Sequence, residues 1–467
     1  MDFWRHALVG NVLVLAILLA IAASLRAGSS RWRALAIPDG IVAGALGLAL
    51  GRSGLDAIPA AIDFGGAVLE PLVYHGFAVV FIAVGLQAAP GGRASGSARS
   101  LAFALVGFAV LQSILGFALL AAWAAGTGDA LHPGLGFMIM LGFAQGPGQA
   151  LAFGGAWEPL GLVAGAQIGL LYAALGFGWC CLLGVPLVAL GRRRGWLDPL
   201  PEQVEVATPP TTAASEAATP AEAGSGATME PLTIQLIVIG CLYALVFVVL
   251  STISRVLPEH GYARATLWGF HFLCGSSLAI ALRRVVDRRG LRLRLDDALL
   301  GRIAVTAVDV TTAAALAAIE LDALGRLLVP ILVMSTCGGV LTFAVSLWLG
   351  RRAFPEAPFS HVLMLAGTCT GTIPTGFALL RIVDPQLRGP VARSTVLAAT
   401  AAVPLGMPLF FAVIPLSASR WSGDWASAIA TTLAALAVYF VALVWLWRRT
   451  AVLRWLRPWW SAWPRGG

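Results

Sequence analysis

Two interrupted apolar stretches hold the residues best suited to bind a ligand in this chain of 467 residues. The stretch 132–157 contains Gly146-Pro147-Gly148 near its middle, and the stretch 359–383 contains Gly371-Thr372-Ile373-Pro374-Thr375. Glycine and proline interrupt helices, so backbone N–H and C=O groups lose their helical partners at these points. A helix N-terminus then offers N–H donors to an anion, and unwound carbonyl groups offer oxygen ligands to Na⁺.

Candidate binding residues lie at and around both breaks. For an anionic substrate they are Gln145, Gly146, Gly148, Gln149, Thr370, Gly371, Thr372, Thr375 and Arg381. For Na⁺ they are Asp309, Thr372 and Thr375, which would supply carboxylate and hydroxyl oxygens, the donors that hard cations prefer.

Two of these candidates have structural alternatives. Asp309 lies inside the apolar run 303–324, where a carboxylate is costly and is a functional candidate by default. It could instead pair with Arg302 or another buried arginine, or make a helix-packing hydrogen bond. Arg381 could bind a substrate carboxylate through two hydrogen bonds, and the favoured alternative is an anchor on the cytoplasmic side.

The breaks themselves also have two interpretations. Each stretch could be a proline-kinked span whose small residues allow close helix packing. A non-helical backbone at membrane depth, however, is tolerated only where protein or a water-filled cavity surrounds it. Because both halves of the chain carry a break at corresponding places, we favour two re-entrant hairpins, 132–157 and 359–383.

The composition indicates an integral membrane protein. Hydrophobic residues make up 58% of the chain and charged residues 12%, with a mean hydropathy of +0.84, whereas a soluble domain has about 25% charged residues. The basic residues are all arginine, which excludes a P-loop lysine and lysine Schiff-base chemistry. The net charge of +8 comes from arginine clusters between apolar runs, so no nucleic-acid partner is expected. The absence of a catalytic residue pattern argues against an enzyme.

Apolar runs of about 20 residues, long enough to cross a bilayer, recur along the chain. Eleven spans are expected, at 7–25, 34–51, 69–89, 100–126, 160–190, 231–253, 265–282, 303–324, 326–350, 391–416 and 425–447. The arginine clusters fall in alternate loops, which places the N-terminus outside and the C-terminus in the cytoplasm. We therefore expect an all-α, multi-pass protein of the plasma (inner) membrane.

One segment divides the chain into similar halves. Residues 199–230 are rich in Pro, Ala, Ser, Thr and Glu and are expected to form a flexible cytoplasmic linker. The halves 1–198 and 231–416 each have five spans and one hairpin, and the odd number of crossings predicts a 5+5 inverted repeat. Residues 417–467 add an extra transmembrane helix and a Trp/Arg-rich tail suited to the membrane interface.

Four segments carry a family resemblance through their order and spacing. They are Ile37-Pro38-Asp39-Gly40 with Ala43-Gly44, Gly85-Leu86-Gln87, Leu295-Asp296-Asp297 with Asp309, and Gly371-Thr372-Ile373-Pro374-Thr375. By these segments the chain resembles the sodium/glutamate symporter family over most of its length. It departs from the family at Gly146-Pro147-Gly148-Gln149, where the family has Gly-His-Gly-Thr, and at Leu379-Leu380-Arg381, where it has Asn-Met-Gln.

The resemblance implies a homodimeric symporter of glutamate or a related small carboxylate. Coupling to Na⁺ and alternating access by a mobile domain that carries both hairpins are implied in the same way, with no cofactor besides the coupling ion. The departures at the breaks leave a citrate- or malate-type symporter, or an H⁺-coupled organic anion symporter, as the alternative. A channel and a membrane-embedded enzyme are the alternatives from other classes.

Overall fold

The computed structural model describes residues 6–29, 37–59, 62, 64–88, 96–199, 229–258, 262–290, 293–387 and 389–454. Within these ranges all regular secondary structure is helical, and nine helices are long and apolar enough to cross a membrane. They are α1 (Ala7–Gly28), α4 (Gly66–Gly85), α5 (Gly96–Thr127), α8 (Gly165–Arg193), α9 (Pro231–Val256), α12 (Asp297–Ala317), η7 with α13 (Leu321–Ala353), α16 through η8 to α17 (Pro390–Ala418) and α18 (Trp425–Thr450). The predicted class, an all-α polytopic membrane protein, is confirmed.

Two of the eleven expected spans do not form such helices in the described part of the chain. The run 34–51 forms only the 12-residue α3 (Asp39–Leu50), which begins directly after Pro38, because proline disfavours a helical conformation in the residue before it. The run 265–282 is divided between α10 (Tyr262–Leu267), the 3₁₀ turn η6 (Trp268–Phe270) and α11 (His271–Arg289). The second half of α11 is rich in arginine, which shortens its apolar part.

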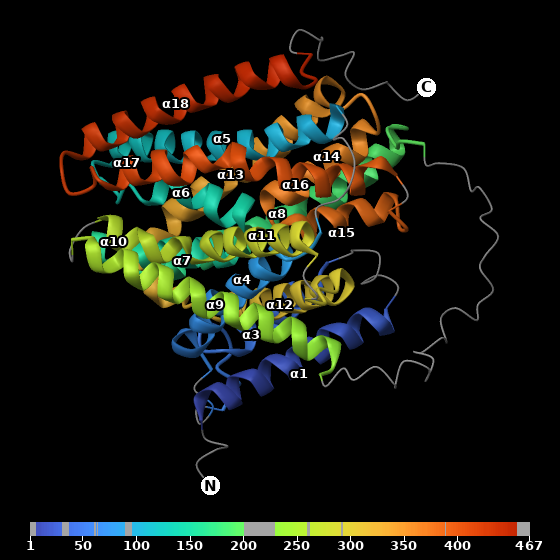
Figure 1. The fold of residues 1–467 in the computed structure, drawn as a ribbon. Helices are drawn as coiled ribbons and strands as arrows, with labels where there is room; N and C mark the ends of the chain where they lie inside the picture. Colours follow the sequence, from blue (N-terminus) through green and yellow to red (C-terminus); the bar gives the residue numbers. More distant parts are fainter. Residues whose placement is uncertain are drawn as a thin grey trace.

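The helices form two bundles that run side by side (Figure 1). In the lower bundle of the view, α12 packs against α3 and α4, and α11 packs against α4 and α9. In the upper bundle, α5 packs against α16 and α18. Helix α7 lies between the bundles, where it packs against α8, α4 and α10 and so joins them.

Each interrupted stretch forms a pair of short helices. The first consists of α6 (Leu135–Ile139), which continues as the π-helical η3 (Met140–Gln145), and α7 (Pro147–Trp157). The second consists of α14 (Pro358–Thr370) and α15 (Ile373–Val383), which pack side by side. The two pairs lie toward opposite ends of the molecule in Figure 1.

His132 ties together the two ends of the first pair. Its Nε2 lies 3.1 Å from the carbonyl oxygen of Leu160, and its Nδ1 lies 3.1 Å from the backbone nitrogen of Gly134. A neutral ring that carries its proton on Nε2 satisfies both bonds, since Nδ1 must accept from the Gly134 N–H group. Burial lowers the pKa of His132, so the neutral ring is the native form.

The contribution of His132 to stability is expected to depend on pH. Because its pKa in the folded chain is below the ordinary value of about 6.5, the contribution is complete above that pH and is lost as the pH falls through the folded pKa. The difference in melting temperature between wild type and His132→Ala should therefore be largest near about pH 8 and shrink toward about pH 5. Thermal unfolding in detergent measures it, and a difference that grows on acidification would contradict the assigned proton.

Arginine residues occupy the last turns of eight α-helices of the described structure, among them Arg255 of α9 and Arg264 of α10. The other six helices carry ten such residues. They are Arg26 of α1, Arg192 and Arg193 of α8, Arg288 and Arg289 of α11, Arg351 and Arg352 of α13, Arg381 of α15, and Arg448 and Arg449 of α18. Arg192 Nη2 donates to the carbonyl oxygen of Ile382 at 2.7 Å. The ends of these six helices lie together at the right of Figure 1, so the clusters predicted for one membrane side do share one end of the molecule.

Two expectations fall largely outside the described residues. Of the linker 199–230, only its first residue and its last two are described, and Glu230 accepts a hydrogen bond from the N–H of Thr233 at the start of α9. The tryptophan residues of the C-terminal tail also lie outside the described residues. They are Trp455, Trp459, Trp460 and Trp463.

Candidate functional site

The two breaks, far apart in the sequence, lie against each other in the fold. A Cβ added to Gly146 would lie 2.7 Å from Cγ2 of Thr372 and 3.9 Å from the carbonyl oxygen of Gly371. Gly146 has φ +90° and ψ 177°, a conformation available to glycine and avoided by residues with a side chain. This geometry turns the chain from η3 into α7 within contact distance of the second break.

The first break ends in an uncapped helix N-terminus. No side chain caps α7, whose first residue is Pro147, and N–H groups in a first turn have no partner within the helix. Gln149 in this turn is 3% exposed, and its Oε1 is buried with no hydrogen-bond partner in the described structure. Gly148 lies against the ring of Phe77, and Gln145 is half-buried. Unpaired donors and an unpaired acceptor therefore gather at the start of α7.

The second break is closed by its own hydroxyl groups. Thr375 Oγ1 accepts from the N–H of Thr372 at 2.7 Å and lies 2.8 Å from the carbonyl oxygen of Gly367, to which it donates. The side chain of Thr372 in turn accepts from the N–H of Thr375, which completes a capping box. Thr370 Oγ1 donates to the carbonyl oxygen of Ala366 at 2.8 Å. These hydroxyl groups shape the backbone, and each oxygen keeps a lone pair for a ligand.

Gln112 of α5 connects the second break to two long helices. Its Nε2 donates to Thr342 Oγ1 of α13 at 2.9 Å and to the carbonyl oxygen of Cys369 at 2.8 Å. The Cys369 carbonyl is one of the last four of α14, which have no partner within the helix. Gln112 is fully buried, and its Oε1 has no partner in the described structure. An amide oxygen beside the negative end of a helix is a suitable cation ligand.

Replacement of Gln112 by leucine is expected to lower the melting temperature and, as a test of the Na⁺ coupling predicted from the sequence, to raise the Na⁺ concentration needed for half-maximal uptake. The Cys369 carbonyl loses its donor, and an unpaired buried acceptor costs about 1–3 kcal/mol. Gln235→Leu is the matched control, because Gln235 is also buried, donates to the carbonyl oxygen of Arg294 and has an unpaired Oε1. Both variants should lose stability, but only Gln112→Leu should alter the Na⁺ dependence; an equal change in both would contradict a role at the break.

Asp309 lies in the other bundle, where α12 packs against α3. A Cβ added to Gly40 would lie 2.6 Å from the carbonyl oxygen of Asp309. Asp39 Oδ1 lies 2.7 Å from Arg26 Nε, and both of these charged groups act on the carboxyl group of Asp309. The charged groups that act on Asp309 thus come from α1 and α3.

Helix α4 packs against both α12, which carries Asp309, and α7 of the first break. On one side of α4, a Cβ on Gly76 would lie 2.5 Å from Cγ2 of Thr311, a residue of α12. On the next residue of α4, the ring of Phe77 lies against Gly148 of α7. The charged neighbours of Asp309 are Asp39 and Arg26, and its place in the cation site stays a prediction.

Arg381 lies away from the breaks. It is exposed in the last turn of α15. It lies eight positions after Ile373, the first residue of that helix, which corresponds to about 12 Å along the helix axis. The structure thus separates Arg381 from the other predicted substrate ligands and places it with the arginine-rich helix ends.

Two residues at the breaks were not identified from the sequence. Gln112 is the single amide side chain in the apolar run 100–126, and a lone amide inside a span is a signal that could have found it. Phe77 is one of many apolar residues of its span, and no local pattern distinguishes it. Only the packing of α4 against α7 reveals its position.

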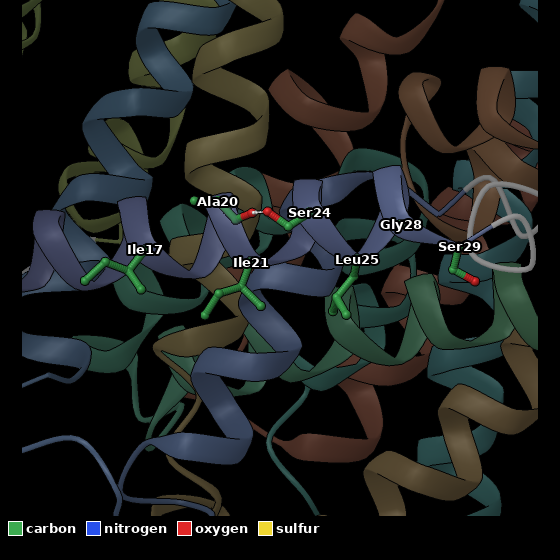
Figure 2. Close-up of a pocket in the computed structure, with 7 residues that line it drawn as sticks. All are labelled: Ile17, Ala20, Ile21, Ser24, Leu25, Gly28 and Ser29. Carbon is green, nitrogen blue, oxygen red and sulfur yellow. Dashed lines mark hydrogen bonds between the residues drawn. The ribbon is translucent and has the colours of Figure 1, made fainter.

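An exposed apolar groove lies elsewhere, along α1. Figure 2 shows its lining residues, Ile17, Ala20, Ile21, Ser24, Leu25, Gly28 and Ser29. The hydroxyl of Ser24 donates to the carbonyl oxygen of Ala20 at 2.8 Å, so this polar group is already satisfied. The groove offers apolar surface and carries none of the predicted ligands.

The site is thus the meeting point of two broken helix pairs, at which two helix N-termini and two helix C-termini converge. Comparison of the chain with protein-family models, with curated proteins and with solved structures finds no match.

Proposed function

We propose that the chain is a secondary active transporter that moves a small carboxylate across the membrane together with Na⁺. The observation that carries the proposal is the contact between Gly146 and Thr372, which joins two broken helix pairs from opposite ends of the molecule. In this proposal the pairs are re-entrant hairpins, and glutamate is the substrate that the family resemblance implies.

The electrostatics of the helix ends support binding of both ions at one place. The N-termini of α7 and α15 carry partial positive charge, which suits a carboxylate. The C-termini of η3 and α14 carry partial negative charge and carbonyl oxygens that do not all bond within the helix, which suit Na⁺. A site of this kind binds anion and cation without a charged side chain. Thr372, Thr375 and Gln112 are the proposed oxygen ligands beside the cation.

The packing of the lower bundle supports the inverted repeat. In a 5+5 arrangement α3 is equivalent to α11, and α4 is equivalent to α12. Helix α3 packs against α12 and α11 packs against α4, which are the two contacts that a twofold axis between α4 and α12 would exchange. The arginine-rich helix ends support a cytoplasmic location for that end of the molecule, with the N-terminus outside. The homodimer stays a prediction.

Uptake by the purified full-length chain in proteoliposomes tests the proposal. Labelled glutamate, malate, citrate and phenylacetate are offered with an inward Na⁺ gradient, with an inward H⁺ gradient, and with neither. Saturable accumulation above that of protein-free vesicles, driven by Na⁺, is the expected result. Accumulation driven only by the H⁺ gradient would show that H⁺, and not Na⁺, is the coupling ion. A flux that depends on neither gradient would contradict secondary active transport.

A further inference from the structure

We infer that the substrate of this site is a monocarboxylate with an apolar body, whose single carboxylate is its only charge. The inference rests on the proposed transport of a small carboxylate and replaces glutamate, the substrate implied by the family resemblance, with a singly charged acid. It follows from three features of the surroundings of the breaks. The helix segments around them carry no charged side chains, the predicted charged ligands Arg381 and Asp309 have other neighbours, and aromatic rings lie next to both breaks.

The helix segments that surround the breaks contain no Asp, Glu, Lys or Arg. The charged residues of the broken pairs and of α4, α5, α8 and α13 lie toward the ends of these helices, as Arg381 does in α15, and α12, which also contacts α7, carries Asp309. The uncharged stretches are 71–88, 100–128, 133–157, 162–191, 265–282, 327–350 and 357–380. Any ionic group of a substrate bound between the breaks must therefore be stabilised by helix ends and amide groups.

The two charged side chains that could have extended the site have other neighbours. Arg381 lies at the opposite end of α15 from Thr372. Asp309 packs against Gly40 of α3 through its backbone, and its charged neighbours are Asp39 and Arg26. A second carboxylate or an ammonium group on the substrate would thus have no counter-charge, and burial of an uncompensated charge is strongly unfavourable.

Aromatic rings provide an apolar surface next to the N-terminus of α7. The rings of Phe77, Phe81 and Phe272 form a cluster with centroid distances of 4.8, 5.0 and 5.2 Å. Phe77 is the member of the cluster that lies against Gly148. On the side of the second break, a Cβ on Gly371 would lie 3.1 Å from the ring of Phe177. These rings suit an aliphatic or aromatic body joined to the carboxylate.

Calorimetric titration of the purified full-length chain in Na⁺-containing detergent buffer tests the inference. Phenylacetate and 4-methylvalerate are compared with glutamate, malate and citrate. Phenylacetate is expected to bind at least tenfold more tightly than any of the multiply charged acids. Tighter binding of glutamate or malate would overturn the inference and leave the transport proposal intact, whereas failure of every acid both to bind and to accumulate in vesicles would overturn the transport proposal itself.

Substitution of Phe77 tests whether this ring determines substrate specificity or only stabilises the fold. In Phe77→Ala the affinity for phenylacetate should fall at least fivefold, while the affinity for acetate changes less than twofold. Phe103→Ala is the control, because Phe103 is also buried but stacks on Trp447 of α18, and it should leave the ratio of the two affinities unchanged. Phe77→Leu, which keeps an apolar side chain, replaces Phe77→Ala if that variant does not fold. An equal loss for both acids would overturn the assignment of Phe77.

Discussion

Replacement of Gly146 by alanine is expected to reduce uptake at least tenfold and to lower the melting temperature of the protein. Gly146 has φ +90° and ψ 177°, and a non-glycine residue in this region is strained by about 1–3 kcal/mol. In addition, the new Cβ would lie 2.7 Å from Cγ2 of Thr372, closer than two carbon atoms can approach. Relief of either conflict moves the first break away from the second, and the opposing helix ends no longer share one ligand.

The measurement is uptake, per amount of monodisperse protein, of whichever labelled acid the wild type accumulates. Gly178→Ala is the control. Gly178 lies in α8, which packs against both broken helix pairs, and a Cβ at this position would have no atom within 4 Å. The double variant Gly146→Ala/Thr372→Ser removes the nearest methyl group but not the backbone strain, so it should remain impaired. Full recovery in the double variant would contradict the conformational argument, and normal uptake by Gly146→Ala alone would contradict the site.

Alanine at Gly154 and alanine at Gly155 are expected to have opposite effects on stability. Both glycine residues lie in α7, where alanine normally favours the helix by about 1 kcal/mol. A Cβ on Gly154, however, would lie 2.0 Å from the carbonyl oxygen of Gly165 in α8, whereas a Cβ on Gly155 would lie 3.7 Å from Cβ of Ala166. Gly154→Ala must therefore push α7 away from α8, and such overpacking costs about 1–3 kcal/mol or more.

Thermal unfolding of both variants in the same detergent measures the difference. The melting temperature of Gly154→Ala should fall by several degrees, and that of Gly155→Ala should stay unchanged or rise. The same contact is reciprocal, since a Cβ on Gly165 would lie 2.2 Å from the carbonyl oxygen of Gly154, so Gly165→Ala should resemble Gly154→Ala. Similar melting temperatures for the Gly154 and Gly155 variants would show that backbone contact does not hold α7 against α8.

The helices of this protein were largely predictable because the signal for them is local. A bilayer requires about 20 apolar residues per span, and nine helices of the described structure satisfy this requirement where apolar runs predicted spans. The two exceptions have local causes as well: Pro38 precedes the short α3, and arginine residues shorten the apolar part of α11. The positions of both breaks were also predictable, because Gly146 and Gly371 mark them directly.

The membership of the site was only partly predictable, because it depends on contacts between distant segments. Asp309 was a reasonable candidate as a carboxylate inside an apolar run, yet the packing of α12 against α3 places it near Arg26. Arg381 is close to the second break in sequence, but it lies about 12 Å from the first residue of α15 along the helix axis. Gln112 lies in a distant span and reaches the Cys369 carbonyl because α5 crosses the end of α14.

By itself, the sequence determined that this is an all-helical membrane protein with two broken helices, because hydropathy and helix interruption are properties of neighbouring residues. Tertiary structure alone decided that Gly146 meets Thr372, that Asp309 packs against Gly40, and that Phe77 faces Gly148. The physical reason is that these contacts follow from the close approach of helix backbones. The pairing of helices through their small residues depends on the whole bundle. It therefore cannot be identified from a periodic pattern in any single span.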